Sequence, residues 1–64
     1  MKVRYVGCSD DQVAFGGNKD PRPLLKEGEV YTVLEKKVHS YHTKYFLTVH
    51  PTLPFNSVCF EPAE

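Results

Sequence analysis

The segment "VYTVLEKKVHSYHTKYFLTVH", Val30 to His50, alternates apolar and polar side chains on both sides of a histidine-rich break. Short alternation with β-branched and aromatic residues is typical of half-buried strands. The break "HSYHT", His39 to Thr43, separates two such runs, so Val30 to Val38 and Lys44 to His50 are predicted to form a β-hairpin. The break contains neither Asn-Gly nor Asp-Gly, so we do not expect a tight two-residue turn.

All three histidines lie in this hairpin, which raises the question of a metal site. A straight strand rises about 3.3 Å per residue, which places His42 and His50 roughly 25 Å apart, too far to share one ion. Zinc prefers four tetrahedral ligands, usually in close pairs, and the chain has no Cys-x-x-Cys. We therefore predict no metal and no cofactor, and interpret the histidines as solvated side chains. A smaller site of His39, His42 and one cysteine, or a pH-sensing role, stays open.

The segments around the hairpin predict further short elements. Lys2 to Val6 alternates and is predicted to be a strand. Gly7 to Pro23 holds three glycines, two prolines and three aspartates, so we expect a long loop. The prolines of Pro51 to Pro54 are expected to end the hairpin, because each proline removes a ladder donor. A 3₁₀ turn is predicted around Phe55 to Val58 and a last strand near Cys59 to Glu61. No α-helix is predicted.

The composition limits the class of protein. The chain has 64 residues and is read as one domain, residues 1–64, and its apolar fraction of 41% suffices for one small core. Basic and acidic residues are equal in number, which argues against a broad positive field. No stretch reaches the length of a membrane span, and no apolar run follows the first basic residues. We therefore expect a cytoplasmic protein, in which Cys8 and Cys59 fit as free thiols; a single disulfide between them stays open.

Together these elements predict an all-β fold, a small barrel of about five short strands with a long first loop and a 3₁₀ turn before the last strand. "LLKEGEVYTVLEKK" resembles the diverging turn and second strand of SH3 folds, "KYFLTV" the third strand, and "LPFNSVCFEP" the 3₁₀ turn and last strand. The loop from Gly7 to Pro23 falls where the SH3 RT loop would lie. More closely, the chain is similar to small, mostly uncharacterised SH3-like proteins of bacteria and their phages.

The resemblance covers nearly the whole chain and implies an SH3-like barrel with a binding surface. It also implies that the first and last strands are neighbours, which would let Cys8 and Cys59 approach each other; the alternative is two small buried hydrophobic side chains. The chain departs from polyproline-binding SH3 domains, because it has no Trp and begins "KVRYVGC". A polyproline ligand is therefore not predicted.

Eight aromatic residues are more than so small a core can hold. The expected core consists of Val3, Tyr31, Val33, Leu47, Val49 and Phe60. The remaining aromatics and the acidic loop predict a non-enzymatic module that binds an unidentified protein, with aromatic anchors giving affinity and carboxylates selecting a basic partner. The predicted surface comprises Tyr41, Tyr45, Phe55, Asp10, Asp11 and Asp20. A monomer or a weak homodimer is expected.

The alternative is a nucleic-acid-binding protein. A basic stripe interleaved with aromatic rings can bind a single strand by phosphate contacts and stacking. The candidate residues for that stripe are Lys2, Arg4, Lys36 and Lys44. The zero net charge favours the protein-binding interpretation.

Overall fold

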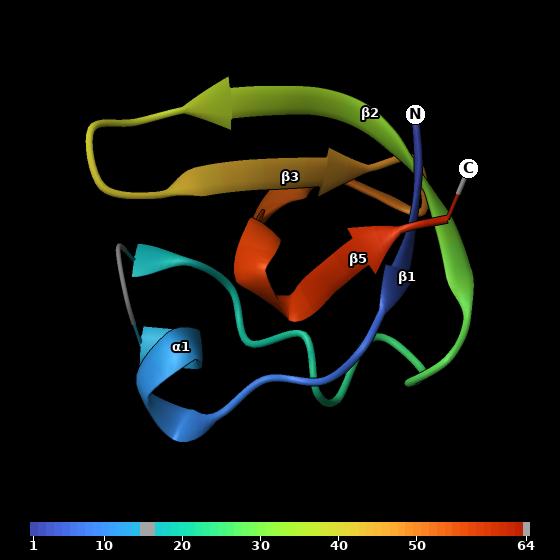
Figure 1. Cartoon of the computed structure of the whole chain (residues 1–64), viewed down its shortest axis with the longest axis horizontal. Coiled ribbons are helices and arrows are strands. Elements are labelled where there is room, and N and C mark those ends of the chain that lie inside the picture. Colours follow the sequence, from blue (N-terminus) through green and yellow to red (C-terminus); the bar gives the residue numbers. More distant parts are fainter. Residues whose placement is uncertain (15–16, 64) are drawn as a thin grey trace.

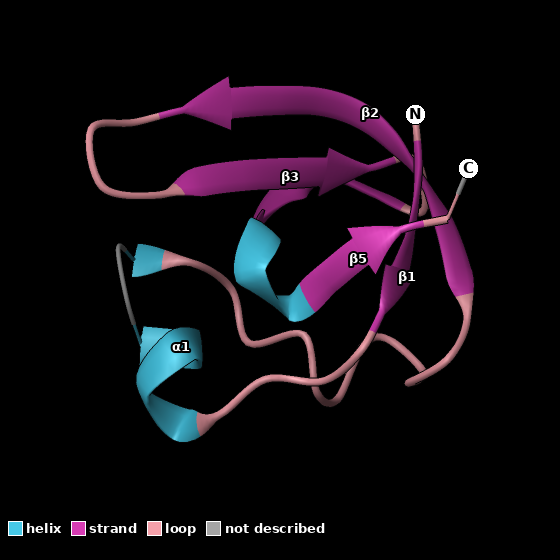
Figure 2. Cartoon of the chain, viewed as in Figure 1, coloured by secondary structure: helices cyan, strands magenta, loops and turns pink. Residues whose placement is uncertain are grey.

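The computed structural model describes residues 1–14 and 17–63, and the side chain of Ala14 is outside that description. Five antiparallel strands form one sheet in the order β4-β3-β2-β1-β5, which confirms the predicted all-β class (Figures 1 and 2). The strands are β1 (Lys2–Tyr5), β2 (Val30–Val38), β3 (Thr43–Leu47), β4 (His50–Asn56) and β5 (Phe60–Pro62). A short helix, α1 (Asp10–Ala14), and a 3₁₀ turn, η2 (Ser57–Cys59), complete the fold.

The predicted hairpin is confirmed as β2 and β3, and β2 is the longest strand. Its first residues pair with β1 and the rest with β3, so it curves around the molecule (Figure 1). The turn is closed by the backbone N–H of His39, which donates to the carbonyl of His42 at 2.8 Å. A β-bulge between Val33 and Glu35 inserts one extra residue on β2. The bulge reverses which face of the sheet the following side chains occupy.

The predicted second arm of the hairpin is shorter than expected. β3 ends at Leu47, and the chain reverses through Thr48 and Val49 so that His50, the first residue of β4, pairs with Leu47. The prediction that the prolines end the strand is wrong, because Pro51 and Pro54 both lie inside β4. β4 is an edge strand of the sheet, and neither proline is among its residues paired with β3. A proline is tolerated on an edge strand where its missing N–H would face away from the neighbouring strand.

The core lies between the two ends of the bent sheet and includes a cluster of packed aromatic rings. The ring centroid of Phe60 lies 5.7 Å from that of Tyr5, 5.7 Å from that of Tyr45 and 6.5 Å from that of Phe55. The buried apolar residues are Val3, Tyr5, Leu25, Leu47, Phe55, Cys59 and Phe60. Of the expected core, Val3, Leu47 and Phe60 are buried, and Tyr31 and Val33 pack partly against them. The prediction for Val49 is wrong, since it is 55% exposed in the tight turn.

The helix α1 was not predicted, although its local signal is present in the sequence. The hydroxyl of Ser9 accepts from the backbone N–H of Gln12 at 3.2 Å, and the side-chain oxygen of Gln12 accepts from the backbone N–H of Ser9 at 3.0 Å. This reciprocal pair is a capping box, a motif that satisfies the first donors of a helix. It could have been found in "SDDQ", Ser9 to Gln12.

Candidate interaction site

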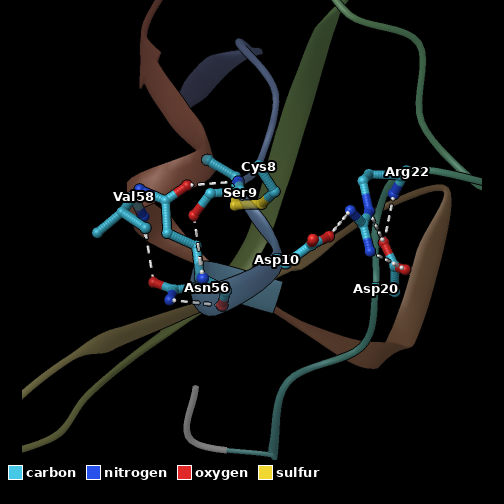
Figure 3. Close-up of a disulfide and its surroundings, with 9 residues drawn as sticks. Cys8, Ser9, Asp10, Asp20, Arg22, Asn56 and Val58 are labelled. Atoms are coloured by element: carbon cyan, nitrogen blue, oxygen red, sulfur yellow. Dashed lines mark hydrogen bonds and ion pairs between the residues drawn. A yellow bond between two sulfur atoms is a disulfide. The ribbon is translucent and has the colours of Figure 1, made fainter. Parts of the chain in front are cut away.

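Cys8 and Cys59 form a disulfide, so the prediction of free thiols is wrong (Figure 3). Their Cα atoms lie 5.1 Å apart, within the range that a disulfide spans. The pairing follows from the sheet: β1 and β5 are neighbours, and the backbone N–H of Val6 donates to the carbonyl of Cys59 at 2.8 Å. The disulfide joins the segment before α1 to η2. Disulfides persist mainly in oxidising compartments. The cysteines therefore no longer argue for the predicted cytoplasmic location.

A shallow pocket of about 290 Å³ opens between α1 and η2. It is lined by Asp11, Gln12, Asn56 and Val58. Only Asp11 belongs to the predicted surface; the other three residues were missed by sequence reasoning. Val58 is 53% exposed and presents an apolar wall to solvent. The pocket therefore offers one carboxylate beside one apolar side chain.

Asn56 fixes the two walls of this pocket. It is buried, with 4% exposure, and both ends of its amide are engaged. Its Nδ2 donates to the carbonyl of Gln12 at 3.3 Å, and its Oδ1 accepts from the backbone N–H of Val58 at 3.2 Å, as the N-cap of η2 (Figure 3). The hydrogen bond to Gln12 and the disulfide both tie α1 to η2, so the pocket is formed before any ligand binds.

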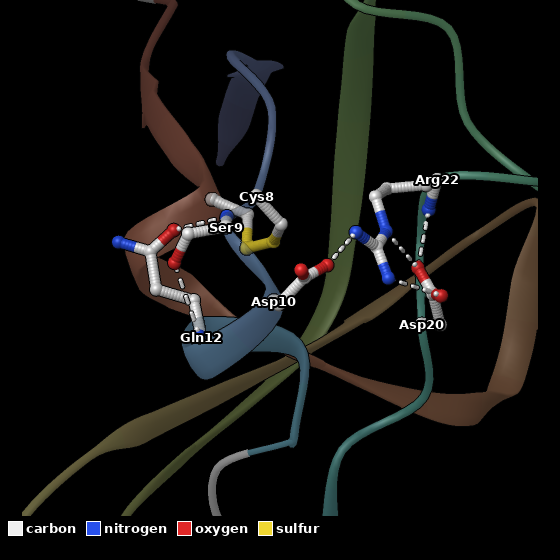
Figure 4. Close-up of polar contacts among 7 residues, drawn as sticks. Cys8, Ser9, Asp10, Gln12, Asp20 and Arg22 are labelled. Carbon is white, nitrogen blue, oxygen red and sulfur yellow. Dashed lines mark hydrogen bonds and ion pairs between the residues drawn. A yellow bond between two sulfur atoms is a disulfide. The ribbon is translucent and has the colours of Figure 1, made fainter.

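The three predicted acids have different environments, because Arg22 binds two of them (Figure 4). Its Nη1 donates to Asp10, while its Nε and Nη2 donate to the two oxygens of Asp20 at 3.1 and 3.0 Å. These hydrogen bonds hold the pKa of Asp20 below its usual range. Asp11 forms no ion pair with the described residues and lies at the pocket. Asp10 keeps an exposed side chain despite its ion pair, whereas Asp11 is the predicted acid that lines the pocket.

The three predicted aromatic anchors do not form one surface. Tyr41 is 90% exposed in the hairpin turn. Tyr45 is half-buried, with its ring against Phe60. The prediction for Phe55 is wrong, because its side chain is 0% exposed: Phe55 is the cross-strand partner of Tyr45, and both face the core.

The predicted basic stripe does not form either. Lys2 and Arg4 lie on β1, whereas Lys36 and Lys44 lie on the β2–β3 hairpin, beyond the part of β2 that pairs with β1. Lys36 pairs with Tyr45, so these two side chains share a face. Lys44 precedes Tyr45 on β3, and successive side chains alternate. Lys36 and Lys44 therefore lie on opposite faces of the hairpin.

The histidines divide into a pair and a single residue. The rings of His39 and His42 stack with centroids 4.9 Å apart. His50 lies at the start of β4, with its ring 6.2 Å from that of Phe55. Within residues 1–14 and 17–63, no three His, Cys, Asp or Glu side chains are grouped as metal ligands would be.

The stacked pair predicts a pH dependence of stability. Desolvation, together with the nearby His39 and Lys44, holds the pKa of His42 below its ordinary value of about 6.5. Between these two pKa values the unfolded chain binds more protons than the folded chain. The free energy of unfolding is therefore expected to fall as the pH decreases from 7 through the folded pKa of His42. Urea unfolding at pH 7 and 5 measures the loss.

In the His42→Gln variant this decrease should be smaller than in the wild type. The control is Ser40→Ala, which changes the same turn without removing an imidazole and should keep the wild-type pH dependence. An unchanged decrease in His42→Gln would contradict the assignment to His42.

Comparison with known proteins gives no relative: no family model matches the chain, nor does any curated protein or solved structure match it significantly. In the described part of the chain, no helix is long and apolar enough to cross a membrane. The fold and the site define a small all-β domain with a disulfide beside an open pocket that carries one carboxylate. The SH3-like resemblance stays a prediction.

Proposed function

We propose that this protein is a non-enzymatic protein-interaction module that binds a basic side chain of its partner in the pocket between α1 and η2. The observation that carries the proposal is the position of Asp11. Asp10 and Asp20 are engaged by Arg22, whereas Asp11 lies at the pocket without an ion pair among the described residues. A partner cation would supply the missing opposite charge.

The shape and lining of the pocket support this ligand class. Lysine and arginine side chains combine an apolar stem with a charged head. The stem can pack on Val58 while the head reaches Asp11, and Gln12 can contribute polar contacts. Asn56 and the disulfide hold the pocket in shape, which lowers the ordering cost of binding. The small, open site suits a weak and transient complex.

The strand order and the η2 turn before β5 support the SH3-like assignment made from the sequence. On this proposal the binding surface differs from the predicted one. It includes Asp11 and three unpredicted residues, and it excludes Phe55. The basic stripe is not proposed as a nucleic-acid site, because its four residues do not share a face.

Substitution of Asp11 by Asn is expected to weaken binding of lysine-containing peptides about three- to fivefold, the effect of losing one exposed ion pair. The measurement is fluorescence anisotropy with labelled extended peptides that carry one central lysine, compared with the same peptides carrying glutamine. Circular dichroism checks that the variant is folded.

The matched control is Glu29→Gln, which removes the same charge at an exposed position outside the pocket. It should leave peptide affinity unchanged. Equal losses in Asp11→Asn and Glu29→Gln would mean that only net charge matters, and would contradict a site at Asp11. So would equal binding of lysine and glutamine peptides.

A further inference from the structure

Two lysines of the hairpin lie directly opposite each other. The β2–β3 register pairs Lys37 with Lys44. Like charges at directly opposite positions of an antiparallel pair repel and destabilise the sheet. Neither lysine forms an ion pair with the described residues, although the Nζ of Lys37 lies 5.5 Å from the ring centroid of Phe46. The hairpin therefore keeps a repulsive pair of cations that a bound anion would relieve.

This lysine pair adjoins the proposed pocket. Lys44 also pairs with Asn56 across β3 and β4, and paired residues share a face of the sheet. Asn56 lines the pocket, and its side chain is bonded to Gln12 of α1. Lys37, Lys44, Asn56 and the pocket thus follow one another across the same side of the molecule. The acid of this surface, Asp11, lies on α1, and the two cations lie on the hairpin.

We propose that Lys37 and Lys44 bind a carboxylate of the same ligand whose basic side chain occupies the pocket at Asp11. The partner is then a peptide segment that carries both a basic and an acidic residue. The inference rests on the proposed function. It adds that the peptide binds in one chain direction only. A single cation site accepts a lysine in either chain direction, whereas a surface with separate acidic and basic ends selects one orientation.

The spacing of the strands limits the separation of the two ligand charges. Lys44 lies one strand spacing, about 4.8 Å, from Asn56, and the pocket begins there. An extended peptide rises about 3.3 Å per residue. The basic and the acidic residue of the ligand must therefore lie at least about two positions apart to reach both ends of the surface.

The test uses three labelled peptides of one length: one with lysine and glutamate three residues apart, one with the glutamate replaced by glutamine, and one with the lysine replaced by glutamine. On the wild-type protein, the lysine–glutamate peptide should bind about three- to fivefold more tightly than the lysine–glutamine peptide. On Lys44→Gln this advantage should disappear. On Lys36→Gln, which removes the same charge from the opposite face of the same hairpin, it should remain.

The outcomes separate this inference from the proposed function. If the glutamate gives no advantage but Asp11→Asn still weakens lysine peptides, the lysine pair is not a ligand site and the pocket stands. If lysine peptides bind independently of Asp11, both proposals fail. A further outcome is that an oligothymidylate binds more tightly than every peptide and loses this binding in Lys44→Gln. In that case Lys37 and Lys44 bind phosphate, and the peptide inference is overturned.

A measurement without ligand tests the premise. Because Lys44→Gln removes the repulsion from Lys37, the variant should melt at a higher temperature than the wild type, and Lys36→Gln should not. Equal or lower melting of Lys44→Gln would show that the hairpin holds no unrelieved repulsion, which would overturn the inference.

Discussion

Reduction of the Cys8–Cys59 disulfide is expected to lower the free energy of unfolding by about 4 kcal/mol. The two cysteines are 51 residues apart, so the bond closes nearly the whole chain into a loop and restricts the unfolded state strongly. A domain of 64 residues has a total stability of about 3 to 10 kcal/mol at ordinary values per residue. The disulfide then supplies a large share of the stability.

Urea unfolding with and without a dithiol reductant measures this effect. The control is the Cys8→Ala, Cys59→Ala double variant, which should match the reduced wild type and should not respond to the reductant. Thiol titration checks that the reductant has opened the disulfide. If the urea midpoint of the wild type is then unchanged, the prediction is contradicted. Amide hydrogen exchange in α1 should also accelerate, because the disulfide is one of the links between α1 and η2.

Substitution of Phe55 by Ala is expected to cost about 3 to 5 kcal/mol, the usual loss for truncating a buried aromatic ring. Phe55 has no exposed surface and contacts the rings of Phe60 and His50. Its removal leaves a cavity in a core that contains few other large side chains. Chemical denaturation monitored by circular dichroism gives the loss directly.

The matched comparison is Tyr41→Ala, also an aromatic truncation. Tyr41 is almost fully exposed, so its removal should change the free energy of unfolding by less than about 0.5 kcal/mol. If Phe55→Ala were instead as stable as the wild type and lost only peptide binding, Phe55 would belong to the surface, as the sequence predicted. The two variants together test the division between core and surface.

Local patterns predicted every strand except β4. The strand Val30 to Val38 was predicted with the bounds that the structure has, and the 3₁₀ turn and the last strand lie within two residues of their predicted positions. Alternation and turn residues act over a few positions, so they can be read locally. The sequence does not reveal that the prolines belong to β4, because proline is tolerated within a strand mainly at a sheet edge, and the edge is decided by the tertiary structure.

The candidate site was predicted only in part. Asp11 was named among the acids, but Asp10 and Asp20 were not distinguished from it. The difference arises because Arg22 folds back onto a residue 12 positions earlier. Nothing in the sequence around Asn56 indicates its role in the pocket. Its role depends on α1, which is 44 residues away along the chain.

By itself the sequence determined the all-β class, the hairpin and the absence of a broad positive charge. Only the tertiary structure decided which side chains share a face. Unbroken alternation along β2 would place Lys37 on the face of Val33, which turns toward the core. The bulge between Val33 and Glu35 shifts the alternation by one residue and brings Lys37 opposite Lys44 instead. The pairing of Cys8 with Cys59 depends likewise on the contact of β1 with β5, because residues so distant along the chain meet only when the sheet closes.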